Sequence, residues 1–460
     1  MSIVSSYIVP HPPMIINKIG NGREKQIEKT INSYEEIAKE IGNLKPDTII
    51  ITSPHAKYYS NHFYIMPGNT LKGNFECFGV KEISFEKEND ISLIEEIESI
   101  CSVENISCGR LEEDVLDHGT MIPLYFISKY LPRCKIVVIG LSYLSLDIHY
   151  KLGEIIKRAV DKIQKKVVFV ASGDLSHKLQ AHGPYGFTKE GPIYDDKVCS
   201  IMKNCNFEEF LEFDELFLEK AAECGHRSFT IMSGIYDKMN VSSSFLSHED
   251  ITGVGYAICK FYPKNENTNR DFRVKYLEKV KNNLKLRYSN CDNYIKLAKD
   301  SIYNYVKFNR IIDIPVYIDS SLINNRAAVF VSIHKFGRLR GCIGTIIPTK
   351  NNIAKEIIDN AISAASNDYR FDKIDISELD YLEINVDVLT SPTKIDSKDK
   401  LDVKKYGVIV TSGLKRGLLL PDLDGVDTVD EQIEIAMNKG NISRNEKYEL
   451  ERFEVIRHKI

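Results

Sequence analysis

Residues 167–177 read VVFVASGDLSH, and this stretch decides the fold of the first half of the chain. Its five apolar residues, 167–171, predict a strand buried on both faces, and a polar loop follows immediately. The same alternation recurs upstream, with strands expected at 3–9, 48–52 and 135–140 and helices at 23–42, 119–130 and 146–164. Short apolar strands that alternate with helices predict an α/β domain in which helices flank a mostly parallel central sheet.

The second half has a different pattern. An amphipathic helix is expected at 294–308 and another at 352–367, with strands at 327–334, 381–389 and 406–411. The strand at 381–389 alternates apolar and polar residues, which predicts an α+β domain with a mixed or antiparallel sheet. We expect domains at 1–262 and 285–460, joined at 263–284 by a polar and then lysine-rich linker with a connecting helix.

Length and composition narrow the class of protein. The 460 residues suggest two or three domains, and 43% hydrophobic residues suffice for sizeable cores. The net charge of −4, from 61 basic and 65 acidic residues, argues against a nucleic-acid partner. No apolar run approaches the ~18–20 residues that span a membrane, and the first residues lack the basic segment of a signal peptide. Ten cysteines without a CxxC pair suggest reduced thiols, so we expect a cytoplasmic protein.

Four histidines occupy similar positions around the predicted sheet. His11, His55 and His177 each follow a predicted strand, and His118 begins a predicted helix. Because ligands of an open parallel sheet bind at the carboxyl ends of its strands, we expect these imidazoles to converge. Taken singly, each histidine is more simply explained as the cap of a turn. The matching positions of all four favour a shared site.

Two imidazoles, one carboxylate and open positions form the ligand set of non-haem Fe(II) oxygenases, whereas a similar set with Zn²⁺ would suit hydrolysis. Glu223 is the carboxylate candidate, although it is equally compatible with a solvated residue near a helix start. Cys224 is a rival ligand. Further side chains expected to line the site or to orient the ligands are Asp117, Asp174, His182 and His226.

The segments PHPP (10–13), SPH (53–55), LDHG (116–119) and SGDLSH (172–177) resemble the class III extradiol ring-cleavage dioxygenase family, the LigB type, of which Memo proteins are a divergent branch. The resemblance spans about residues 1–262. It implies Fe(II) held by His11, His55 and Glu223, a small aromatic substrate and O₂. It also implies His177 as the acid/base residue, with His118 as a second active-site histidine. Memo-like relatives carry Cys-Gly at the third-ligand position, as Cys224 and Gly225 do here.

In the second half the segment LRGCIGT (339–345) places Cys342 between glycines, close to Arg340. Nearby guanidinium groups would lower the pKa of the thiol and favour a nucleophile. The alternative is a small buried residue in a strand. With AASNDYRF (364–371), LEINVDVL (382–389) and GLLLP (417–421), this segment resembles the AMMECR family over about residues 285–460. That resemblance implies a fold and a motif but no reaction.

Prokaryotic genomes often pair an AMMECR protein and a Memo-like protein with a radical S-adenosylmethionine enzyme. The resemblance therefore also allows a Memo-like metalloprotein, hydrolytic or redox, that works with such an enzyme. No CxxxCxxC motif for the radical enzyme itself occurs in the chain. Members of these families often assemble, so a homo-oligomer is left open.

Overall fold

The computed structural model describes residues 2–112, 114–423 and 425–460, which divide into one compact unit up to Leu277 and a second from Glu278 to Ile460. The first unit is built on an eight-stranded sheet in the order β6-β3-β7-β2-β8-β1-β10-β9. These strands are β1 (Ile3–Val9), β2 (Thr48–Ser53), β3 (Phe63–Ile65), β6 (Cys108–Arg110), β7 (Lys135–Gly140), β8 (Val167–Ser172), β9 (Met239–Glu249) and β10 (Tyr256–Glu266).

The centre of this sheet is parallel and one edge is antiparallel. Strand β8 pairs in parallel with β1 and β2, and β2 pairs in parallel with β7. Strand β10 then pairs antiparallel with β1, and β9 pairs antiparallel with β10. The prediction of a mostly parallel sheet flanked by helices is confirmed. The β9/β10 pair was not predicted, because β9 reads MNVSSSFLSHE, with three serines in a row, and has no long apolar run.

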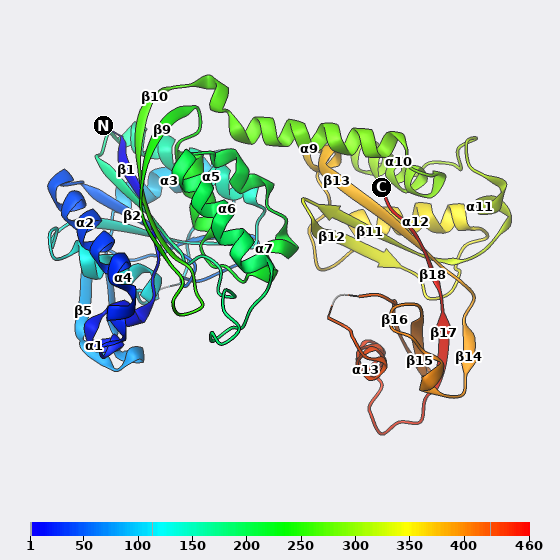
Figure 1. Ribbon diagram of the computed structural model, residues 1–460. Coiled ribbons are helices and arrows are strands. Elements are labelled where there is room, and N and C mark those ends of the chain that lie inside the picture. Colours follow the sequence, from blue (N-terminus) through cyan, green and yellow to red (C-terminus); the bar gives the residue numbers. More distant parts are fainter. Residues whose placement is uncertain (1, 113, 424) are drawn as a thin grey trace. The chain divides into compact units, whose positions relative to one another are not determined.

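Helices cover both faces of the sheet, as Figure 1 shows. Alternate residues of β8 point to opposite cores, Phe169 to one and Val168 and Val170 to the other. The first core is closed by α3 (Ile91–Val103), α5 (Leu146–Ile163), α6 (Glu190–Asn204), α7 (Glu215–Ala221) and α8 (His226–Ile235). The second is closed by α2 (Glu28–Leu44), α4 (His118–Ile127) and the hairpin β4 (Thr70–Phe75)–β5 (Val80–Glu88).

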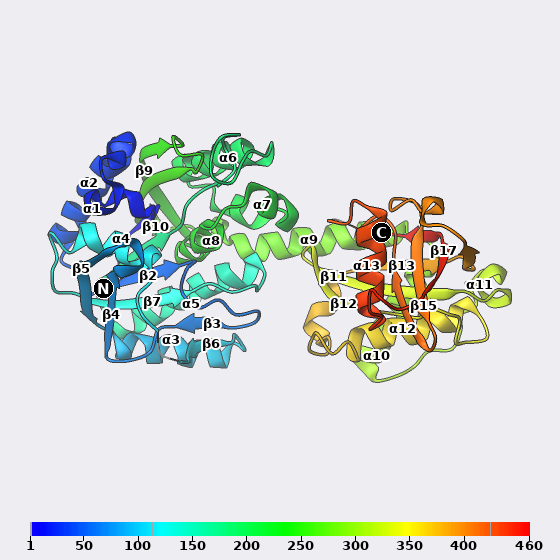
Figure 2. The same cartoon turned by 90° about the horizontal axis from the view of Figure 1, so that it is seen from below.

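The second unit contains two four-stranded antiparallel sheets, and its α+β prediction is also confirmed. The first sheet has the order β12-β11-β13-β18, from β11 (Ala328–Lys335), β12 (Arg338–Gly344), β13 (Leu382–Leu389) and β18 (Val455–His458). The second has the order β14-β17-β15-β16, from β14 (Thr393–Ile395), β15 (Gly407–Ser412), β16 (Lys415–Leu419) and β17 (Glu449–Phe453). The helices are α10 (Asn293–Phe308), α11 (Ser320–Asn324), α12 (Ile353–Ser366) and α13 (Val429–Lys439), which Figure 2 shows from below.

Two local predictions need adjustment. The helix expected at 23–42 begins only at Glu28, after the 3₁₀ segment Arg23–Ile27, and runs on to Leu44. The segment expected as linker, 263–284, contains most of the expected connecting helix, α9 (Phe272–Ser289), but it begins with the end of β10. Within the described residues no helix is both long and apolar enough to cross a membrane.

Candidate metal centre

The hydrogen bonds around His11 fix which of its ring nitrogens carries the proton. The residue directly follows β1 and is buried. Its Nδ1 lies 2.9 Å from the Oγ of Ser172, whose hydroxyl lies 2.6 Å from the carbonyl of Gly119 and donates to it. Because the hydroxyl of Ser172 donates its proton to that carbonyl oxygen, its Oγ accepts a hydrogen bond from the Nδ1–H of His11. Nε2 of His11 therefore carries a lone pair, which is the tautomer a metal ligand needs.

His55 and His118 approach that lone pair. Nε2 of His55 lies 3.0 Å from Nε2 of His11, and the rings of His55 and His118 lie 4.0 Å apart between centroids. The candidate ligand atoms of His11, His55 and His118 all fall within 4.8 Å of one another. Two ring nitrogens at 3.0 Å repel each other unless a proton or a cation lies between them. The arrangement therefore fits a bound metal ion.

A side-chain hydrogen bond joins the segment before His55 to the segment before His118. Asp117 caps the N-terminus of α4, and its carboxylate also accepts a hydrogen bond of 2.6 Å from the hydroxyl of Ser53, at the end of β2. Gly119 makes this approach possible, because a Cβ there would lie 2.4 Å from the Oγ of Ser53. Asp117 thus orients the backbone on both sides of the cluster.

Burial keeps the imidazoles neutral. The pKa of His11 lies well below its ordinary value, because the ring is desolvated and because the other histidines surround it. Desolvation also lowers the pKa of His118 to about 4 and that of His177 to about 4. Neutral imidazoles at pH 7 offer their lone pairs to a cation without first losing a proton.

Cys224 and Asp174 form a second group of candidate ligands with His11, separate from the group that contains His55 and His118. The Sγ of Cys224 lies 3.6 Å from Nε2 of His11, and an Oδ2 of Asp174 lies 3.9 Å from the same nitrogen. Nitrogen and sulfur ligands of one tetrahedral ion lie about 3.3–3.7 Å apart at the usual bond lengths. Burial raises the pKa of Cys224, so the thiol needs a cation beside it to become a thiolate at neutral pH.

Glu223 does not join either group of candidate ligands. Its carboxylate accepts the backbone N–H of His226 at 2.5 Å, at the start of α8, and burial raises its pKa to about 7. Ala222 ends α7 in the left-handed conformation, with φ of +52°, just before these two residues. Of the two residues considered for the third ligand position, the structure brings Cys224 and not Glu223 to His11.

The other three histidines predicted for the site, His177, His226 and His182, differ in burial and in hydrogen bonding. His177 contributes a ring nitrogen, Nε2, that is buried and has no hydrogen-bond partner among the described residues. His226 is a core residue whose Nε2 lies 2.9 Å from the carbonyl oxygen of Phe210. His182 is exposed on the loop before α6. Ser172, which fixes His11, was missed, although it belongs to the quoted SGDLSH segment.

Cys342 of the second unit lies in β12, the alternative that the sequence left open. Its Sγ lies 3.2 Å from the Oγ of Ser332, and its backbone N–H donates to Asp368. Arg340 is engaged elsewhere, with Glu378. The expected lowering of the pKa of Cys342 is wrong: burial raises it, outweighing the nearby guanidinium of Arg370.

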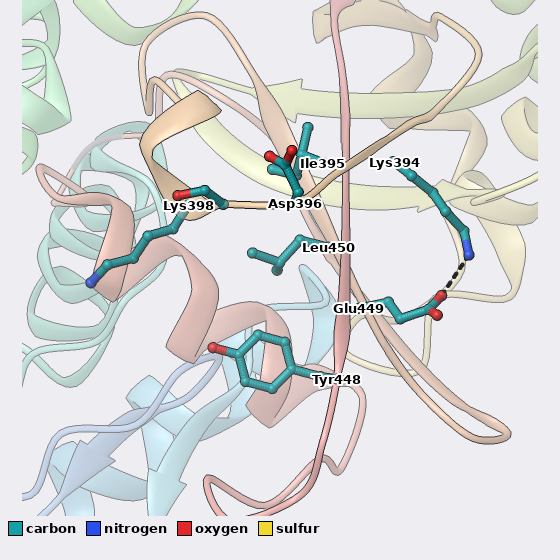
Figure 3. A pocket seen from close by; sticks show the side chains of 8 residues that line it. Lys394, Ile395, Asp396, Lys398, Tyr448, Glu449 and Leu450 are labelled. Atoms are coloured by element: carbon teal, nitrogen blue, oxygen red, sulfur yellow. Dashed lines mark hydrogen bonds and ion pairs between the residues drawn. The ribbon is translucent and has the colours of Figure 1, made fainter.

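A hollow of about 420 Å³ also occurs in the second unit, along β14 and β17 (Figure 3). Its charged side chains are paired, Lys394 with Glu449 at 2.8 Å and Lys398 with Asp430 at 2.6 Å. These pairs leave the hollow without the convergent polar groups that mark the histidine cluster.

Comparison with known proteins assigns each unit to a family. The family model described as the catalytic LigB subunit of aromatic ring-opening dioxygenase matches residues 5–259, and that of AMMECR1 matches residues 295–458. Protein CA_C1420 of Clostridium acetobutylicum is 39% identical over 470 residues and covers 100% of both chains. A Thermotoga maritima protein is 48% identical over 168 residues, 36% of this chain and 97% of its own. Among solved structures, PH0010 of Pyrococcus horikoshii is 28% identical, with a TM-score of 0.34, over 36% of this chain and 88% of that one.

Proposed function

The chain belongs to the family of the catalytic LigB subunit of aromatic ring-opening dioxygenases and carries an AMMECR1 domain, and from this membership we propose that it is a non-haem Fe(II)-dependent oxidoreductase. It would open a catechol-like aromatic ring with O₂. The observation that carries the proposal is the unprotonated Nε2 of His11, which faces Nε2 of His55 at 3.0 Å.

His11 and His55 would hold the metal, and Cys224, which lies beside Nε2 of His11 but outside the group formed by His11, His55 and His118, would be the third ligand. Fe(II) at this position would supply open coordination sites and the one-electron chemistry that reaction with O₂ requires. The neutral state of these imidazoles and the tautomer of His11 support this assignment. Zn²⁺ would fit the same donor atoms.

His177 would act as the acid/base residue. Its Nε2 is buried and unpaired among the described residues, so it can accept a proton from a catechol hydroxyl and later return it to the oxygen of the opened ring. His118 would donate or accept a hydrogen bond at the second substrate oxygen. Both atoms of O₂ enter the product as one ring C–C bond breaks, so the reaction needs no external reductant.

A second candidate function is a Memo-like metalloprotein, hydrolytic or redox, that works with a radical S-adenosylmethionine enzyme. It is favoured by one observation, the 3.6 Å separation between the Sγ of Cys224 and His11. A thiolate in place of a carboxylate suits Zn²⁺ as well as iron. The metal retained on anaerobic purification separates the two: iron favours the dioxygenase and zinc the alternative.

The third ligand is tested by Cys224→Ser, with Glu223→Gln as the matched control. Both residues are adjacent, and the glutamine retains an oxygen that can accept the N–H of His226. We expect Cys224→Ser to lower the affinity for the metal at least tenfold and Glu223→Gln to leave it nearly unchanged. The opposite result would restore Glu223 as the ligand.

The reaction is tested by oxygen uptake of Fe(II)-reconstituted protein with a panel of catechols and aminophenols. His177→Ala should abolish substrate-dependent uptake while iron stays bound, and His182→Ala, at an exposed histidine of the following loop, should not. Loss of iron from His177→Ala would make this residue a ligand. Uptake that is equal in wild type and His177→Ala would remove the residue from the mechanism.

A further inference from the structure

The loop between β8 and α6 carries both His177 and an aromatic residue that contacts it. Within it the ring of Tyr185 lies against the ring of His177, with centroids 5.2 Å apart and planes inclined by 30°. Tyr185 is nevertheless 59% exposed. The contact with His177 therefore does little to bury Tyr185, and it leaves much of the aromatic surface beside the cluster open to solvent.

The position of Tyr185 is set by the base of its loop. The backbone N–H of Leu179 donates to the carbonyl of Gly253, and that of Thr188 donates to the carbonyl of Lys178, both at 3.2 Å. The side chain of Gln180 adds a hydrogen bond of 2.7 Å to the carbonyl of Asp250. With both arms anchored, the chain turns back directly after Tyr185, at Gly186, whose φ of +76° favours glycine.

A second aromatic ring borders the cluster from another segment. Phe78, at the end of the 3₁₀ segment Glu76–Phe78, lies edge-on to His118 with centroids 5.6 Å apart. Aromatic residues thus accompany the two histidines, His118 and His177, that are proposed to face the substrate. Such rings prefer planar aromatic neighbours in stacked or edge-to-face contact.

We propose that Tyr185 is a specificity-determining residue, which contacts the ring of the substrate and selects flat aromatic diols over other chelating ligands. The inference rests on the proposed function, because it needs a substrate bound beside His177. The exposed face of Tyr185 is the surface that a planar ring would cover. Small chelating molecules bind a metal through their oxygen atoms whether or not they contain an aromatic ring. The metal alone therefore does not select aromatic substrates.

The test compares two bidentate oxygen ligands by calorimetry on anaerobic, Fe(II)-loaded full-length protein. Catechol carries a ring and acetohydroxamic acid does not. We expect Tyr185→Leu to weaken catechol binding about three- to tenfold, the worth of an aromatic pair, without changing the affinity for acetohydroxamic acid or the iron content. Tyr185→Phe should retain the wild-type affinity. Phe187→Leu, at an exposed aromatic residue of the same loop, is the matched control.

A contact readout that does not depend on affinity comes from Tyr185→Trp. The chain contains no tryptophan, so this residue would be the only one, and Phe187→Trp gives the control. Saturating catechol should change the emission at position 185 and leave that at position 187 nearly unchanged.

The possible failures differ. If Tyr185→Leu affects both ligands equally or neither, and emission at position 185 does not respond, the inference is overturned while the metal site stands. If the wild-type protein retains no metal or binds neither ligand, the proposed function falls, and the inference falls with it.

Discussion

At the scale of single residues, metal binding depends on which nitrogen of His11 carries the proton. Ser172 sets this tautomer, because its hydroxyl accepts a hydrogen bond from Nδ1–H of His11 and donates one to the carbonyl oxygen of Gly119. We predict that Ser172→Ala lowers the affinity for the metal about 10- to 100-fold. Metal titration of the purified variant measures this. Ser142→Ala removes an equally buried hydroxyl after β7 and should have no such effect. Equal losses in both variants would indicate general destabilisation.

A second residue-scale prediction concerns acid stability of the second unit. Asp368 accepts two hydrogen bonds from the guanidinium of Arg370 and one each from the backbone N–H groups of Arg370 and Cys342. These partners, the guanidinium first, lower its pKa to about 2. A carboxylate with a lowered pKa in the folded state stabilises that state above its unfolded pKa. This stabilisation is lost as the pH falls from about 4 to about 2.

The measurement is the pH dependence of unfolding of the second unit, followed for wild type and Asp368→Asn. The substitution should lower stability at pH 7 by up to about 2 kcal/mol, discounted for solvent screening, and flatten the slope below pH 4. An unchanged slope would show that Asp368 is not the titrating group.

At the scale of elements, the contact between α5 and α8 fixes the residues that follow Cys224. Gly153 of α5 and Gly234 of α8 allow the helices to touch: a Cβ on Gly153 would lie 2.0 Å from the carbonyl oxygen of Ile231. Because backbone cannot give way as a side chain can, Gly153→Ala should destabilise the first unit by about 1–3 kcal/mol. Chemical denaturation measures this. Lys162→Ala, at an exposed position of α5, is the control and should cost much less.

The elements that were predicted from the sequence are those with strong periodicity. The buried strands 3–9, 48–52, 135–140 and 167–171 have apolar runs that only a covered sheet accommodates, and the loops after them placed the histidines at one edge. Strands β9 and β12 lacked such runs. Which of the adjacent residues Glu223 and Cys224 approaches His11 is set by the local path of the loop before α8, which includes the left-handed residue Ala222 and has no signature in the sequence.

At the scale of the whole molecule, each unit has hydrophobic cores of its own, two in the first and three smaller ones in the second. We therefore predict two calorimetric unfolding transitions. Metal at about 100 times its Kd should add about 2.7 kcal/mol to the first unit alone and raise its midpoint by about 5 °C or more. A chelator should reverse the shift. A single transition that moves as a whole would contradict independent units.

The most direct test of the central claim is the fate of isotopically labelled O₂. Fe(II)-loaded protein is given a catechol that supports oxygen uptake, and the product is analysed by mass spectrometry. A ring-opening dioxygenase places both atoms of one O₂ in one product molecule, and His177→Ala forms none. A quinone without label, or a product with label from water, would show that the histidine cluster performs another reaction.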